Sequence, residues 1–339
     1  QHGKSFTELF APLGIEVALL TGSMKAKEKR EALAKIADGT AQMIVGTHAV
    51  IQKGVEYHKI GLVITDEQHR FGVRQRSMLA EKGENPHVLV MTATPIPRTL
   101  ALILYGDLDI SIIDELPPGR QQIDTIGVNT SYRQRIYAFL GKEAAAGRQA
   151  YVICPMIEEN EKMEVENVLD YTEKLKAALP ECKIACVHGK MKAAEKQEIM
   201  DNFAAGNTDI LVSTTVIEVG INVPNATVML IENSERFGLA QLHQLRGRVG
   251  RGSEKSYCIL VSDAKTKIAV ERMQTMTKTT DGFVISEMDL KLRGPGEFFG
   301  TRQHGLPELK IANLYRDMAI LKEAQQAAGD LLRKDPQLE

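Results

Sequence analysis

The sequence has few cysteines, no long apolar run and almost no net charge, and each of these shortages excludes a class of protein. Its 339 residues contain four cysteines, which are too few and too scattered for a disulfide framework. No apolar run approaches the ~20 residues that a membrane-spanning helix needs. The formal net charge of −2 excludes a histone-like polyelectrolyte, although local basic patches can still bind nucleic acid.

Cysteine and histidine side chains occur close together at one place in the sequence. Cys182 and Cys186 precede His188, and this spacing could begin a metal site. No second ligand pair follows at a matching spacing, so the simpler interpretation is strand residues in a reducing cytosol.

The composition is that of an ordinary globular protein. Hydrophobic residues make up 43% and charged residues 25% of the chain, which is enough apolar material to bury a core. At ~100–200 residues per domain, the length predicts two domains with room for an appendage.

In residues 1–115, short aliphatic runs alternate with polar helical stretches. This rhythm predicts an α/β fold with a parallel sheet covered by helices, because continuous apolar runs suit strands that are buried on both faces. The expected strands are Val17–Leu20, Met43–Val45, Leu62–Ile64 and Val88–Met91, with helices at Lys25–Ala37 and Arg74–Glu81.

The same alternation of strands and helices resumes after residues 114–120. This segment has the sequence Asp-Glu-Leu-Pro-Pro-Gly-Arg, and its prolines and glycine are typical of a linker. We therefore expect domains at 1–115 and 126–263, joined by a linker at 116–125. The expected strands of the second domain are Ala150–Cys154, Lys183–Val187, Ile210–Ser213, Val228–Ile231 and Tyr257–Val261, with helices at Val165–Leu179 and Ala193–Phe203.

The last part, residues 264–339, follows a different pattern. Lys265–Thr279 is polar and predicts a helix, and the glycine-rich stretch Asp281–Gly305 predicts irregular structure. From Glu308 onward, apolar residues recur at steps of three and four, which predicts an amphipathic helix that packs against a core.

Two carboxylates follow one of the predicted strands of the first domain. Asp66 and Glu67 follow Leu62–Ile64 after one threonine, which places them at the carboxyl edge of a parallel sheet, where ligands of such sheets bind. One acid can hold Mg²⁺ through water and the next can orient an attacking water. Asp-Glu pairs also occur as ordinary solvated strand ends, so this motif alone leaves both interpretations open.

Hydroxyl residues end the next predicted strand. Thr92-Ala93-Thr94-Pro95 follows Val88–Met91, where the threonines could hydrogen-bond the acidic motif, although a plain turn can have the same sequence.

Arginine and glycine alternate in the second domain, between Gln244 and Arg251. Arg248 and Arg251 are three residues apart, so on a helix they share a face, and guanidinium groups have forked donors suited to phosphate. A solvated basic helix is the alternative. The interleaved glycines argue against it, because they weaken a helix and indicate close approach of backbone or ligand.

In this order, the three motifs resemble those of superfamily-two helicase and translocase motors, which contain two RecA-like lobes of the P-loop NTPase type with ATP in the cleft between them. Three segments are similar to two narrower groups, the RecG branch-migration helicases and the transcription-repair coupling factors. These segments are the residues that follow His69, the residues that follow Thr94, and the run Phe237–Arg251. His188–Lys192, Val216–Gly220 and Asp281–Gln303 resemble RecG in particular. The last of these segments resembles a helical hairpin and loop that drive translocation.

The resemblance implies a role for individual residues. Asp66 would hold Mg²⁺ through water, Glu67 would activate the hydrolytic water, and Arg248 and Arg251 would reach the γ-phosphate as arginine fingers. The residues that would line the ATP cleft or couple it to movement are Gln68, His69, Thr92, Thr94, Gly220, Asn222 and Gln244. The residues that would grip DNA are Thr21, Gly22, Thr47 and His48 in one lobe and Lys190, Thr214 and Thr215 in the other. The translocation motif would contribute Arg272, Arg302 and Gln303, and for Arg272 a solvated helix arginine is an equal alternative.

The sequence departs from this family at two points. No Gly-x-x-x-x-Gly-Lys-Ser/Thr occurs, although such a loop cradles the phosphates of ATP in these motors. Because the chain starts at Gln1, which resembles the end of a later motif, we expect a C-terminal motor portion that lacks ATPase activity by itself. Asn222 stands where the wider superfamily often has an acid, and it is neutral but can still accept a hydrogen bond.

The leading hypothesis is therefore the motor of an ATP-driven double-stranded DNA translocase that remodels stalled forks and Holliday junctions. The resemblance implies ATP and Mg²⁺ as cofactors, branched DNA and single-stranded DNA-binding protein as partners, no membrane contact, a monomer, and a bacterial, nucleoid-associated location in the cytoplasm. The alternatives are the motor of a coupling factor that binds RNA polymerase, and a non-catalytic DNA-binding or interaction module.

Overall fold

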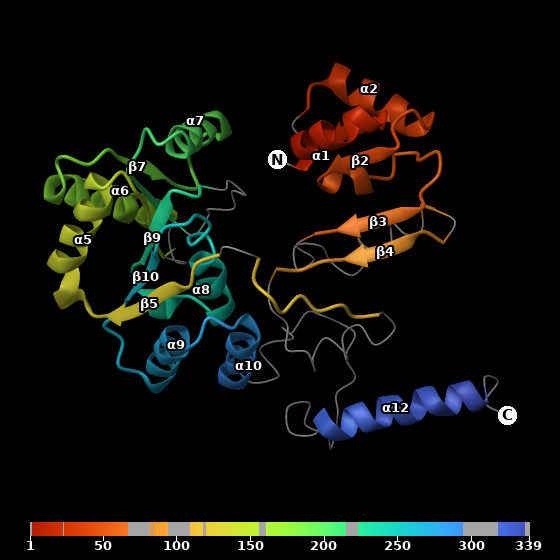
Figure 1. Cartoon of the computed structure of the whole chain (residues 1–339). Coiled ribbons are helices and arrows are strands. Elements are labelled where there is room, and N and C mark those ends of the chain that lie inside the picture. The colour runs from red at the N-terminus through yellow and green to blue at the C-terminus, as the bar shows by residue number, and fades with distance from the viewer. Residues whose placement is uncertain are drawn as a thin grey trace. The chain divides into compact units, whose positions relative to one another are not determined.

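The chain forms two compact units, Gln1–Thr94 and Pro95–Glu339. The computed structural model describes residues 2–22, 24–66, 82–83, 85–93, 109–117, 120–155, 161–214, 223–293 and 318–335 (Figure 1). Each unit is an α/β arrangement, as the alternation of strands and helices predicts.

The first unit contains two separate pairs of parallel strands. β1 (Val17–Leu20) pairs with β2 (Met43–Gly46), and β3 (Leu62–Thr65) pairs with β4 (His87–Val90). The accompanying helices are α1 (His2–Phe10) and α2 (Ala26–Ala37). Leu20 of β1 and Ile36 of α2 are almost fully buried and form the centre of a small core.

The pair β3–β4 has aliphatic side chains on its surface. Leu62, Ile64, Val88 and Leu89 each expose about half of their surface. Parallel strands are normally covered on both faces, and a two-stranded sheet is marginal by itself. The strand pair that carries Asp66 therefore has less apolar cover than its residue types require.

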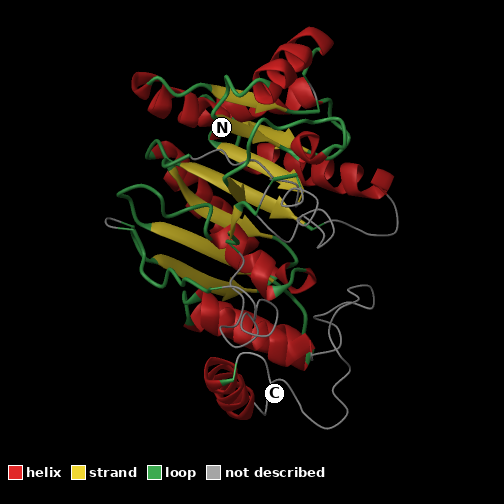
Figure 2. Ribbon diagram, turned by 90° about the vertical axis from the view of Figure 1, so that its right-hand side faces the viewer, coloured by secondary structure: helices red, strands yellow, loops and turns green. Residues whose placement is uncertain are grey.

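The second unit is built on one six-stranded sheet in the order β5-β10-β9-β6-β8-β7, in which every neighbouring pair is parallel (Figure 2). Every residue of the central strands β6, β8 and β9 is buried, which explains why they are continuous rather than alternating apolar runs. The six strands are β5 (Ile123–Val128), β6 (Gln149–Cys154), β7 (Ile184–Val187), β8 (Ile210–Thr214), β9 (Ala226–Ile231) and β10 (Ser256–Val261).

Helices cover both faces of this sheet. On one face, α5 (Arg133–Ala145) and α6 (Glu161–Ala178) pack against a core that contains Val152. On the other face, the core contains Ile153 and is covered by α7 (Ala193–Ala204) and by three further helices (Figures 1 and 2). These three are α8 (Leu239–Arg246), α9 (Lys267–Lys278) and α10 (Gly282–Arg293).

The predicted strands and the parallel α/β fold are confirmed, with two local differences. Ile123–Thr125 of the predicted linker belong to β5, an edge strand that sequence reasoning missed because its apolar residues are few. The prediction of irregular structure over Asp281–Gly305 is wrong for Gly282–Arg293, which form α10. The buried residues Ile285 and Asp289 lie one helical turn apart on α10, so tertiary packing selects the helix there.

The helix predicted near the C-terminus is confirmed over α12 (Met318–Lys334). Its residues Ile320 and Leu331 are exposed, so the predicted packing against a core is not found for them. The first part of this pattern, from Glu308, and the predicted helix Arg74–Glu81 lie outside the described residues. Among the described helices, none combines the length and the apolar character needed to cross a membrane.

The central strands should dominate the stability of the second unit. Ile231 of β9 is fully buried and Ile126 of β5 is 45% exposed, so the two allow a comparison of the same residue type. We expect Ile231→Ala to lower the free energy of unfolding by about 2–5 kcal/mol because it leaves a cavity. The control Ile126→Ala should lower it by about 1 kcal/mol or less. Urea unfolding followed by circular dichroism measures both, and equal losses would contradict the assigned core.

Candidate functional site

Asp66 and Thr92 lie at the same edge of the first unit. Asp66 directly follows β3 and Thr92 comes two residues after β4, and the register of this parallel pair sets Thr65 beside Val90. The Asp66 carboxylate is half-exposed, and its Oδ2 atom lies 3.8 Å from Nε2 of His2. The predicted neighbours Glu67, Gln68, His69 and Thr94 lie outside the described residues. The described part of this edge therefore presents one accessible carboxylate beside a hydroxyl residue.

The pair β1–β2 brings a second set of predicted residues together. Thr21 and Gly22 follow β1, and Thr47 and His48 follow β2, whose Gly46 lies beside Leu20. Only glycine fits at position 46, because an added Cβ would lie 2.3 Å from the Leu20 carbonyl oxygen. Thr47 and His48 are exposed, so this edge offers hydroxyl and imidazole groups to solvent.

Arg248 and Arg251 lie on a turn that follows α8. The prediction that they share a helical face is wrong, because α8 ends at Arg246. The backbone N–H of Arg248 donates to the Leu245 carbonyl at 3.0 Å, and the guanidinium Nε of Arg251 donates to the Gly247 carbonyl at 3.2 Å. Gln244, the remaining predicted residue of this motif, lies on α8.

Two glycines in and directly after this turn stand where a larger residue would not fit. Gly250 has a φ of +73°, and an added Cβ would lie 2.8 Å from Cγ1 of Ile123. An added Cβ at Gly252 would lie 2.6 Å from the Pro224 carbonyl oxygen. The expectation of close approach is therefore confirmed for Gly250, whereas an added Cβ at Gly247 would meet only ordinary contacts at 3.5 Å or more.

Arg246 has a different role from its neighbours. Its side chain is 2% exposed, and Nη1 donates to the carbonyls of Met276 at 2.9 Å and Thr279 at 3.0 Å, at the end of α9. Nη2 lies 3.2 Å from Nδ1 of His243. Burial and the nearby charges of Arg246 and Arg120 lower the pKa of His243 to about 4, so the imidazole is neutral at pH 7. Arg246 thus caps the carboxyl end of α9, where a cation also interacts well with the helix dipole.

The opposite end of α8 is held by α10. The backbone N–H of Leu239, the first residue of α8, donates to Oδ1 of Asp289 at 3.4 Å, and Asp289 is 3% exposed. This bond satisfies one of the backbone donors that every helix leaves open at its start. Both ends of α8 are therefore bonded to the α9–α10 pair.

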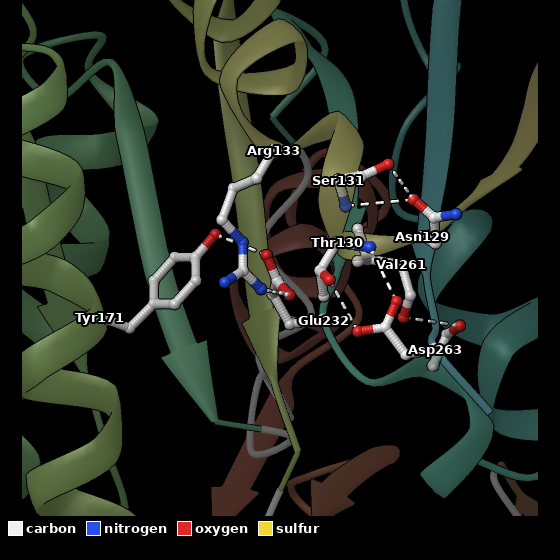
Figure 3. A network of polar contacts seen from close by, with 9 residues as sticks. Asn129, Thr130, Ser131, Arg133, Tyr171, Glu232, Val261 and Asp263 are labelled. Carbon is white, nitrogen blue, oxygen red and sulfur yellow. Dashed lines mark hydrogen bonds and ion pairs between the residues drawn. The ribbon is translucent and has the colours of Figure 1, made fainter.

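A polar network joins the carboxyl ends of β5, β9 and β10 (Figure 3). Glu232, which directly follows β9, is buried and pairs with Arg133 at 2.7 Å, while the Tyr171 hydroxyl donates to its other oxygen at 2.8 Å. Thr130 donates to Asp263 through both its backbone N–H and its hydroxyl. Sequence reasoning missed these residues because their partners are distant in the sequence. The network fixes the loops at this end of the sheet.

The predicted DNA-contacting residues of the second unit lie after β7 and at the end of β8. Lys190 is exposed, whereas Thr214 is 3% exposed and lies within the core. Arg272 on α9 is half-buried, and its Nη1 donates to the Glu235 carbonyl at 3.5 Å. The predicted residues Thr215, Gly220, Asn222, Arg302 and Gln303 lie outside the described residues.

The cysteines lie within or next to the packed sheet. Burial raises the pKa of Cys154 and of Cys258 to about 12, so neither thiol ionises readily at pH 7. Over the described ranges, no group of three or more histidine, cysteine, aspartate or glutamate side chains is placed to hold a metal ion.

Three family models match the chain. The model "DEAD/DEAH box helicase" matches residues 1–103, "Helicase conserved C-terminal domain" matches residues 131–253, and "ATP-dependent DNA helicase RecG, domain 3, C-terminal" matches residues 279–339.

Curated relatives cover nearly the whole chain. The chain is 51% identical to the ATP-dependent DNA helicase RecG of Bacillus subtilis over 99% of its length, and 55% identical to that of Streptococcus pneumoniae over 97%. In both comparisons it covers 49% of the relative, so the chain spans about half the length of these proteins.

Solved structures agree with this similarity. A structure of RecG bound to a three-way DNA junction is 46% identical, with a TM-score of 0.73 over 95% of this chain and 42% of that one. The Saccharomyces cerevisiae protein Dbp5 bound to RNA has a TM-score of 0.57 over 96% of this chain and 77% of that one, but at 16% identity this likeness shows the fold alone.

The buried position of Arg246 predicts a structural effect of its removal. We expect Arg246→Ala to lower the free energy of unfolding by about 3 kcal/mol or more, because two buried carbonyls lose a charged donor. The exposed Arg236 provides a matched control, and Arg236→Ala should change stability by about 0.5 kcal/mol or less. Urea unfolding measures both. An Arg246→Ala variant as stable as the wild type would show that the bonds to α9 do not hold α8 in place.

Proposed function

Because the chain belongs to the RecG family of ATP-dependent DNA helicases over nearly its whole length, we propose that it forms part of the motor of a double-stranded DNA translocase. This translocase remodels stalled forks and Holliday junctions. The observation that carries this proposal is the 46% identity and the TM-score of 0.73 to RecG bound to a three-way junction. The matched RecG domain 3 region favours this function over that of a coupling factor.

We propose that Asp66, Glu67, Arg248 and Arg251 carry the ATP chemistry. The half-exposed carboxylate of Asp66 suits a Mg²⁺ ion held through water, and the ion would neutralise phosphate charge. Glu67 would orient the attacking water. The guanidinium groups of Arg248 and Arg251 would stabilise negative charge on the transferred phosphoryl group. The supporting residues would be Gln68, His69, Thr92, Thr94, Gly220, Asn222 and Gln244.

DNA would be held by its phosphates at the carboxyl ends of strands in both units. Thr47 and His48 in the first unit and Lys190 in the second are exposed, which supports such contacts. The other proposed contacts are Thr21, Gly22 and Thr215, whereas the burial of Thr214 does not support the contact predicted for it. Phosphate contacts carry little sequence information, so a motor of this kind would act on branched DNA of any sequence.

The bonds at both ends of α8 support a coupling of ATP turnover to movement. Since α8 immediately precedes Arg248 and is bonded to α9 and α10, a shift of the arginine turn would move these helices with it. We propose Arg272, Arg302 and Gln303 as the residues that pass this movement to DNA.

The proposed domains are a RecA-like lobe at 1–115, a linker at 116–122, a second RecA-like lobe at 123–263 and a translocation region at 264–339. Residues 123–125 are assigned to the second lobe because they belong to β5. ATP and Mg²⁺ are the proposed cofactors. We further propose a monomer that is associated with the nucleoid in the bacterial cytoplasm and has single-stranded DNA-binding protein as an additional partner.

Residues 1–339 by themselves should not hydrolyse ATP, because they contain no Gly-x-x-x-x-Gly-Lys-Ser/Thr loop and the strand pair beside Asp66 has little apolar cover. We expect phosphate release in the presence of a three-way junction to equal that of the Glu67→Gln variant. Joining the chain to the part of the Bacillus subtilis relative that it does not cover should restore DNA-stimulated turnover. In that chimera, Arg251→Ala should lower kcat by ~10³ while junction binding persists.

The results can contradict this assignment in two ways. Turnover by residues 1–339 that Glu67→Gln abolishes would show that a phosphate-binding loop is not needed. Normal turnover of the Arg251→Ala chimera together with lost junction binding would assign Arg251 to DNA and not to ATP.

Junction binding by residues 1–339 should depend on Lys190. We expect Lys190→Ala to weaken binding to a fluorescent three-way junction and to reduce the slope of log K against log salt by about one. Lys142 is exposed near the end of α5, at the opposite edge of the sheet, and Lys142→Ala is the matched control. Fluorescence anisotropy between low and moderate salt measures both slopes. Equal slopes for the two variants would remove Lys190 from the DNA interface.

A further inference from the structure

Arg120, in the segment that leads into β5, lies beside the arginine turn. Its Nη2 atom donates to the Gly247 carbonyl oxygen at 3.2 Å, and Nε of Arg251 donates to the same oxygen at 3.2 Å. Two guanidinium nitrogens bound to one oxygen can be no farther apart than twice this distance. Arg120 and Arg251 are therefore close neighbours, although more than a hundred residues separate them in the sequence.

The position of Arg120 is fixed by packing. At Gly250, an added Cβ would lie 2.8 Å from Cγ1 of Ile123 and 3.5 Å from the Gln121 carbonyl oxygen. Residues 121–123 therefore pack closely against the turn. Ile123 then begins β5, in register with Ser256 of β10. Arg120 precedes this anchored segment directly, so its backbone approaches the turn as part of the folded second unit.

Two further guanidinium groups act on Arg251. Burial lowers its pKa most, and the positive charges of Arg248 and Arg120 lower it further. In the described ranges, neither Arg120 nor Arg248 forms an ion pair. Two acids close by in the sequence are engaged elsewhere, since Asp124 pairs with Lys255 at 2.7 Å and Glu254 pairs with Arg148 at 3.0 Å.

A single carbonyl uses little of the binding capacity of Arg120. A guanidinium group has five N–H donors in a planar fork, and the bond to Gly247 accounts for one. Forked donors match phosphate oxygens, and several cations brought together favour a ligand with several negative charges. A polyphosphate is a ligand whose charge and geometry fit the paired guanidinium groups of Arg120 and Arg251 with Arg248 on the same turn.

We propose that Arg120 is a third phosphate-binding cation, acting with Arg248 and Arg251 on the polyphosphate of a nucleoside triphosphate. This inference rests on the proposed function and adds a residue to its nucleotide site. Because Arg120 stands just before β5, nucleotide binding would act directly on the segment that leads into this strand.

The test uses residues 1–339 and inorganic tripolyphosphate as the probe. In protein labelled with ¹⁵N on arginine, the Nε–H signals of Arg120, Arg248 and Arg251 should shift on titration. Each signal is assigned by its loss in the corresponding Arg→Gln variant, and Arg120→Lys supplies a second variant should the first not fold. We expect Arg120→Gln to weaken tripolyphosphate binding roughly tenfold, as the loss of one charged hydrogen-bonding group predicts. Arg120→Lys should bind with intermediate affinity because it keeps the charge without the fork.

Arg135 gives a matched control, because it is exposed and lies over the Tyr132 ring at the start of α5. Arg135→Gln should bind tripolyphosphate like the wild type. A shift of Arg248 and Arg251 without Arg120, or wild-type affinity in Arg120→Gln, would overturn the inference and leave the proposed function intact. If none of the three signals shifts, both the inference and the phosphate role of Arg248 and Arg251 fail.

Discussion

Within each unit, the parallel pairing of the strands determines where the described helices and loops can lie. Parallel neighbours need a connection that returns along the sheet, and helices on both faces provide it. The buried strands β6, β8 and β9 therefore place all the loops that follow them at a single edge. Polar residues such as Lys190 and Glu232, which stand after different strands, come to the same edge of the second unit for this reason.

Buried polar groups then fix how the helices meet this sheet. Arg246 and Asp289 are almost completely buried, and each bonds to the end of a neighbouring helix. Such groups are tolerated in a core only when their hydrogen bonds are made, and those bonds have a direction that apolar contacts lack. The result is that α8, α9 and α10 form one packed group, with the arginine turn directly attached to it.

Three arginines within a few residues of one another have separate environments. Arg246 faces the core, whereas Arg248 and Arg251 lie on a turn whose shape depends on the positive φ of Gly250. Positive charge collects at this turn because Arg120 reaches it as well. One guanidinium group thus stabilises the fold from within the core, while Arg120 and Arg251 both bond to the Gly247 carbonyl of the turn.

The sequence alone determined the parallel α/β fold, nearly all the strands and the family, because hydrophobic periodicity and short motifs are local properties of the chain. It also placed Asp66 and Thr92 at strand ends, since a residue after a buried strand has few other positions. The helix α10, the edge strand β5 and the separate role of Arg246 could not be predicted in this way. Only the tertiary structure decided them, because burial, helix capping and the approach of Arg120 to Gly247 depend on contacts between residues that are distant in the sequence.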